Sequence, residues 1–163
     1  MDKSVQLYLK IFKPLSIVCW IASLFFVAFT SKYEDVYGFF LVILGWLSVF
    51  SFGAGFTWLA NPILWYAWFN YKKTKKSFNA SLISTIVSLL FLLFQKISLG
   101  GKTNTPNTDQ LFYVNTDDIY ITGYGFGYFL WVLSSLIMLI GNYIRMQNPN
   151  SEPEIEECDD LTY

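Results

Sequence analysis

The chain has 163 residues, of which 54% are hydrophobic, 20% aromatic and only 14% charged, and it contains no histidine. Soluble domains usually carry about a quarter charged residues, because their surface must stay hydrated. The formal net charge of -1 offers no basic field for nucleic acid, so we expect no nucleic-acid partner. Without histidine the commonest neutral-pH base and metal ligand is missing, and we expect no metal and no cofactor.

Charged residues are absent from four long tracts, which are residues 14–31, 36–71, 77–95 and 119–144. A helix crosses the hydrocarbon core of a bilayer, about 30 Å thick, with about 20 mostly apolar residues. Three tracts suit one crossing each, whereas the second could hold one extended span or two short ones. The tracts predict an all-α integral membrane protein rather than a soluble buried core.

The lysines set the expected orientation, because positive residues near span ends are retained in the cytoplasm. Lysines precede the first tract, and four more follow the second at residues 72–76. A single crossing in the second tract puts both groups inside, which gives four spans with both termini cytoplasmic in a plasma (bacterial inner) membrane. The predicted membrane domain is 1–146, with spans at about 14–31, 38–60, 78–98 and 123–144, an external loop at 100–122, and an acidic disordered cytoplasmic tail at 147–163.

The N-terminus has two interpretations. Basic residues before an apolar stretch and an Ala28-x-Thr30 sequence are compatible with a cleaved secretory signal peptide. We favour a first span preceded by a short helix on the inner membrane surface at residues 4–12, with Pro14 redirecting the chain.

Asn61 and Pro62 are expected to end the second span near Leu59, because proline interrupts the helical hydrogen bonds. The aromatic residues that follow, Trp65 and Trp68 among them, precede four lysines and are typical of an interfacial anchor. A gating or partner-binding elbow is the alternative. Whether residues 63–71 continue the helix or lie along the interface is open.

Small and hydroxyl residues mark expected helix contacts, because apolar side chains give helices little reason to associate in lipid. On the third span they recur with the spacing of one helix face. The same stripe could instead line a permeation path. The predicted packing or path residues are Ser51, Gly55, Ser81, Ser84, Thr85, Ser88, Ser134 and Ser135.

The loop before the fourth span contains two β-rich runs, residues 111–114 and 119–122, around a polar turn, and this pattern predicts a small β-hairpin. An isolated hairpin is marginally stable, so it should rest on the link from Ser31 to Tyr37 or on a partner. The expected external contact residues are Phe112, Tyr113, Asp117, Asp118 and Tyr120.

Residues 122–125, Thr-Gly-Tyr-Gly, resemble part of the potassium-channel filter TVGYG, in which backbone carbonyls bind the ion. The valine is missing, and a strand-like run stands where that family has a pore helix. We therefore interpret the glycines as a tight turn from the hairpin into the fourth span.

No nucleophile and base pair is visible in the sequence, so we expect a protein that is not an enzyme and has no catalytic residues. The expected function is protein–protein contact, as an accessory subunit, scaffold or immunity-type protector. The expected partners are the lipid bilayer and another membrane protein or a second copy of the chain. The alternative is an oligomeric transporter or channel module with a hydroxyl-lined path on the third span.

Overall fold

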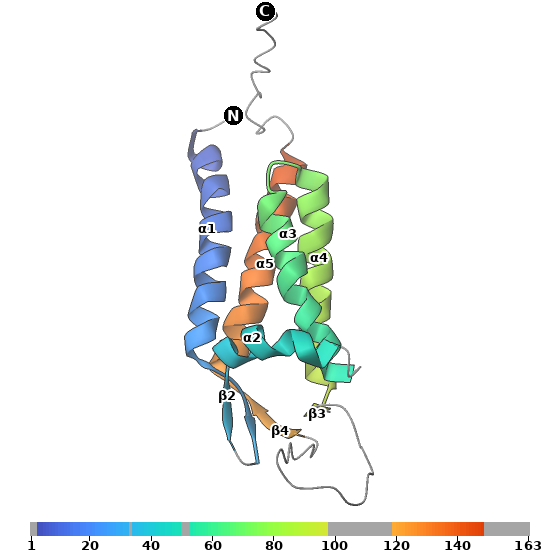
Figure 1. Cartoon of the computed structure of the whole chain (residues 1–163). Helices are drawn as coiled ribbons and strands as arrows, with labels where there is room; N and C mark the ends of the chain where they lie inside the picture. Colours follow the sequence, from blue (N-terminus) through green and yellow to red (C-terminus); the bar gives the residue numbers. More distant parts are fainter. Residues whose placement is uncertain (1–2, 33, 50–52, 98–118, 149–163) are drawn as a thin grey trace, which may run out of the picture.

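The computed structural model describes residues 3–32, 34–49, 53–97 and 119–148 (Figure 1). This part of the chain is mostly helical, with five α-helices, two 3-10 helices and a small antiparallel sheet. In chain order the elements are α1 (Lys3–Phe25), β1 (Val27–Ser31), β2 (Asp35–Tyr37), α2 (Gly38–Ser48), η2 (Gly53–Leu59), α3 (Ala60–Phe69), α4 (Thr74–Leu90), η3 (Phe91–Leu93), β3 (Lys96–Ile97), β4 (Ile119–Tyr124) and α5 (Phe126–Gln147).

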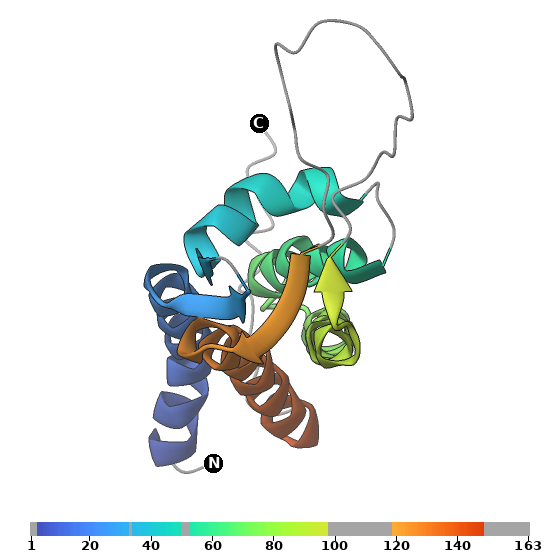
Figure 2. The same ribbon diagram turned by 90° about the horizontal axis from the view of Figure 1, so that it is seen from below.

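Four helices form an upright bundle, and α2 lies across it close to the sheet (Figure 1). The closest helix pairs are α1 with α5, α4 with α5, and α3 with α4. The chain descends in α1, rises in α3, descends in α4 and rises in α5, so the start of α1 and the end of α5 lie at the same end (Figure 1). Helix α2 contacts α1 and η2, and Figure 2 shows it from the sheet end.

The sheet joins segments from both halves of the chain. Strand β1 pairs antiparallel with β2 on one side and with β4 on the other, where Phe29 lies opposite Tyr124. The two-residue β3 pairs with the far edge of β4. A Cβ on Gly125 would collide with the Val27 carbonyl oxygen, so glycine is required where β4 turns into α5.

Two helices are long and apolar enough to cross a membrane, Thr74–Leu93 and Phe126–Gln147, and both have a mean hydropathy of 1.6. The segments Ile11–Phe25 and Gly38–Leu47 are apolar but shorter. The third predicted span, 78–98, and the fourth, 123–144, therefore differ from these helices by a few residues at each end. One reason is that strand β3 takes up residues 96–97 and strand β4 takes up residues 119–124.

The first predicted span, 14–31, is wrong at both ends. Helix α1 continues through Pro14 from Lys3 and ends at Phe25. Proline inside a helix is tolerated where neighbouring groups in a helical bundle satisfy the freed backbone. Residues 27–31 are β1 rather than helix, because pairing with two strands satisfies their backbone and buries Phe29.

The second predicted span, 38–60, is also wrong. Helix α2 has 11 residues and ends at Ser48, so at about 16 Å it is too short to cross the hydrocarbon core. The upright segment in this part of the chain is instead η2 with α3, which begin at Gly53 and end at Phe69 (Figure 1).

Of the predicted hairpin, only the strand at residues 119–122 is confirmed: β4 pairs with β1, which leads into the Ser31–Tyr37 link, and with β3. Its expected partner arm, 111–114, lies outside the described residues, as does the predicted tail from residue 149 onward.

Candidate functional site

The predicted hydroxyl stripe of α4 is buried against its neighbours. The Ser84 hydroxyl donates to the Ala60 carbonyl at 2.9 Å and lies 3.1 Å from the Ser135 hydroxyl. The amide of Asn142 donates to the Ser81 hydroxyl at 3.2 Å. These bonds join α4 to α3 on one side and to α5 on the other, so in the single chain this face is an interface between helices.

The other members of the predicted packing set also bond locally. The hydroxyls of Thr85 and Ser88 donate to backbone carbonyls one turn earlier in α4. Ser134 is buried and donates to the Trp131 carbonyl. Gly55 is buried in η2, whereas Ser51 lies outside the described residues.

Asn61 is the junction of three helices. Its side-chain oxygen accepts hydrogen bonds from the indole N–H of Trp20 in α1 and of Trp131 in α5, each at 2.9 Å. Its amide donates to the Trp58 carbonyl at 3.2 Å. Only 4% of Asn61 is exposed. An amide at this depth is costly in an apolar environment unless it is bonded, and here both of its ends are.

Asn61 and Pro62 therefore do not end a helix, as the sequence had suggested, but lie in the first turn of α3. Proline is tolerated there because the first backbone N–H groups have no partner within the helix. Of the aromatic residues predicted as an anchor, Trp65 and Trp68 both meet the ring of Trp20 edge to face.

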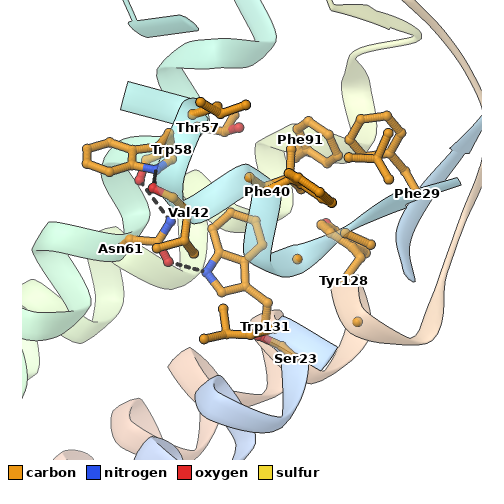
Figure 3. Close-up of a pocket in the computed structure, with 18 of the residues that line it drawn as sticks. Ser23, Phe29, Phe40, Val42, Thr57, Trp58, Asn61, Phe91, Tyr128 and Trp131 are labelled. Carbon is orange, nitrogen blue, oxygen red and sulfur yellow. Dashed lines mark hydrogen bonds between the residues drawn. The ribbon is translucent and has the colours of Figure 1, made fainter. Parts of the chain in front are cut away.

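An apolar cavity of about 260 Å³ lies beside this junction, between α2 and η2 on one side and β1, η3 and α5 on the other (Figure 3). Its deep wall includes the buried side chains of Phe29, Phe91 and Tyr128. Phe40 and Leu44 of α2 also line it, although both are more than half exposed. The cavity therefore connects an exposed face of α2 with the interior.

A close approach of η2 to α2 shapes one side of this cavity. A Cβ on Gly45 would collide with the indole of Trp58. With no side chain in the way, the Trp58 N–H reaches the Val42 carbonyl at 3.3 Å and ties η2 to α2 (Figure 3).

The opposite end of the bundle is basic. Arg145 is buried, donates to the Tyr71 carbonyl and has its guanidinium carbon 4.3 Å from the centre of the Tyr71 ring. Lys13 lies 5.9 Å from the same ring. Burial raises the pKa of the Tyr71 phenol, and the nearby Arg145 charge opposes that rise.

The sheet end carries exposed aromatic rings. Tyr120 of β4 is 60% exposed and Tyr37 of β2 is 45% exposed. The buried side of β4 is anchored by Tyr124, whose hydroxyl lies within hydrogen-bond distance of the carbonyls of Phe91 and Phe94. The other predicted contact residues, Phe112, Tyr113, Asp117 and Asp118, lie outside the described residues.

Sequence reasoning did not find the cavity, the junction at Asn61 or the buried positions of Asn142 and Arg145. An amide inside an apolar tract was the available signal, because such a group must find a partner in lipid. At Asn61 the adjacent proline is the more conspicuous feature of the sequence, and it predicts a helix end instead. The side-chain oxygen of Asn142 is buried without a hydrogen-bond partner in the described part of the chain.

Within the described ranges, no group of three or more His, Cys, Asp and Glu residues is placed to hold a metal ion. In comparisons with known proteins, no family model, no curated protein and no solved structure matches the chain.

Proposed function

We propose that this chain is a four-span protein of the bacterial inner membrane that acts without catalytic chemistry, by binding another membrane protein through its sheet end. The spans would be α1, η2 with α3, α4 with η3, and α5. Both termini would be cytoplasmic, and the sheet would face outward.

The observation that carries the membrane location is the distribution of polar side chains. Among the described residues, 13 polar or charged side chains are buried, compared with 11 hydrophobic ones, while large apolar side chains cover the outside. A water-soluble fold has the opposite preference. In hydrocarbon, polar groups are satisfied inside the bundle and apolar groups face the lipid.

The charges support the orientation. Arg145 lies in the last turn of α5, and the lysines at residues 72–76 lie where α3 is joined to α4, at the end of the bundle where α1 begins (Figure 1). The acidic residues in the described part of the chain, Glu34 and Asp35, lie at the sheet end. By the positive-inside rule the basic end is cytoplasmic.

Cysteine labelling in intact cells tests this orientation. In a background with Cys19 and Cys158 replaced by alanine, an impermeant maleimide should label Thr116→Cys from outside but should leave Thr74→Cys unlabelled until the cells are opened. Labelling of Thr74→Cys in intact cells would contradict the proposed topology.

The exposed rings at Tyr37 and Tyr120 support the contact proposal, because aromatic side chains are enriched in the cores of protein interfaces. A photo-crosslinking amino acid in place of Tyr120 tests it. The matched control is the same substitution at Tyr143 of α5, which is comparably exposed on the bundle. We expect a discrete protein adduct only from position 120. Equal adducts from both positions, or none from position 120, would argue against a contact site at the sheet.

A further inference from the structure

Each polar side chain that lines the cavity beside Asn61 already makes a hydrogen bond within the protein. Asn61 is bonded at both ends of its amide, and the Thr57 hydroxyl donates to the Ala54 carbonyl at 2.6 Å. The Tyr128 hydroxyl donates to the Ser88 carbonyl at 2.9 Å. A ligand that needs several polar partners would not find them here, because the walls are almost entirely apolar, and ordered water likewise needs two or more polar partners.

The size of the cavity suits part of a hydrocarbon chain. Its 260 Å³ exceeds the volume of about 150 Å³ that accommodates benzene in an engineered apolar cavity. It falls just below the range of about 300–1,000 Å³ that is typical of pockets for whole drug-sized molecules. An empty cavity of this size would lose the dispersion contacts of its walls.

The entrance adjoins apolar surface. Phe40 and Leu44 are 55% and 54% exposed, and Phe39, Ile43 and Leu47 of the same helix are about half exposed as well. Helix α2 therefore has no polar face toward solvent. In a membrane, lipid chains would lie against α2 and would reach the cavity beside its exposed side chains Phe40 and Leu44.

We infer that this cavity binds one hydrocarbon chain of a membrane lipid, which enters beside Phe40 and Leu44 and ends against Phe29, Tyr128 and Trp131. The inference rests on the membrane location in the proposed function. A bound chain would fill the space between α2 and the bundle and so hold α2 in its crosswise position.

Photo-labelling tests the inference. The protein is reconstituted in vesicles of phosphatidylethanolamine and phosphatidylglycerol that contain a phospholipid with a diazirine on its acyl chain, and the labelled residues are mapped by mass spectrometry. We expect adducts at the buried Tyr128 and at Trp131, well above the level at Met138, which is buried outside the cavity.

Two variants address the cavity itself. Ala54→Phe fills it from η2, and Leu44→Trp narrows the entrance at a position that is already exposed, so it leaves the buried core intact. In both, labelling of Tyr128 and Trp131 should fall to the level at Met138. The control Ile86→Phe adds comparable bulk to the exposed side of α4 and should leave the labelling unchanged.

Labelling of Tyr128 and Trp131 at background level in the wild type, or labelling that persists in Leu44→Trp, would overturn the inference. Carbonate extraction of the same membranes separates this failure from failure of the proposed function. A chain that stays in the membrane without cavity labelling refutes only the lipid site, whereas a chain released by carbonate refutes the membrane location.

Discussion

Replacing Asn61 with leucine tests the hydrogen-bonded junction that links α1, α3 and α5. The substitution keeps the number and branching of the side-chain heavy atoms but removes the acceptor for the indole N–H groups of Trp20 and Trp131, each at 2.9 Å. It also removes the donor to the Trp58 carbonyl. The two indoles then remain in place without their partner.

The size of the effect follows from these three hydrogen bonds. Leaving a buried donor unsatisfied costs about 1–3 kcal/mol in soluble proteins. Hydrogen bonds between helices in lipid average about 0.6 kcal/mol, because the unfolded state in the membrane also finds partners. Asn61 is buried but both indoles are only partly so. We therefore expect the free energy of unfolding to fall by about 1–3 kcal/mol in total.

The assay is unfolding in mixed micelles with increasing dodecyl sulfate, followed by far-UV circular dichroism so that tryptophan substitutions do not alter the signal. Asn79→Leu is the matched control, since Asn79 is exposed on α4 and should cost little.

A double-mutant cycle identifies the bonds. Trp20→Phe and Trp131→Phe should each lower the free energy of unfolding by less in the Asn61→Leu background than in the wild type. Trp68→Phe should cost the same in both, because its indole donates to the Ser16 hydroxyl instead. Coupling of Asn61 to Trp20 and Trp131 that stays within about 0.5 kcal/mol, the usual limit of additivity, would refute the junction.

Three further predictions use the same unfolding assay or vesicles. A Cβ on Gly141 would lie 2.5 Å from the Cβ of Phe12, so Gly141→Ala should push α1 away from α5 and lower the free energy of unfolding by about 1–3 kcal/mol. An unchanged free energy of unfolding would contradict this packing. Ser84→Ala should lower the free energy of unfolding by about 0.6 kcal/mol, because one hydrogen bond between helices is lost, and should leave ion or solute flux in vesicles unchanged. A flux that falls when Ser84 and Ser88 become leucine would support the alternative transport path. Burial raises the pKa of Tyr124, so the stability that this shift contributes is complete below about pH 10, where the unfolded residue titrates, and is lost as the pH rises toward the folded-state pKa. Tyr124→Phe should remove this part of the loss of stability at alkaline pH. A variant whose stability depends on pH in the same way as the wild type would contradict the prediction.

The parts of the fold that follow from local patterns were predictable. The apolar tracts at 77–95 and 119–144 contain most of the two long apolar helices, because continuous hydrophobicity of this length is a property of the sequence alone. The β-rich residues 119–122 do form a strand. The hydroxyl spacing on the third tract identified residues that are buried together on α4, since helical periodicity brings them to one face.

The path of the second tract could not be read in this way. Its residues are uncharged throughout and mostly apolar, so no periodicity distinguishes a short crosswise helix from part of a long upright one. Asn61, in the first turn of α3, accepts hydrogen bonds from residues that are 41 positions before it and 70 positions after it. Sequence spacing does not indicate that three such distant residues meet.

By itself the sequence determined where ions are avoided, which segments are long and apolar, and which small polar residues share a helix face, because each of these depends on neighbours along the chain. Only the tertiary structure decided that β1 replaces the end of the first helix, that α2 lies across the bundle and that a cavity remains beside it. Those features depend on backbone pairing between β1 and β4 and on packing of Trp58 against Gly45, which are contacts between segments that the sequence keeps apart.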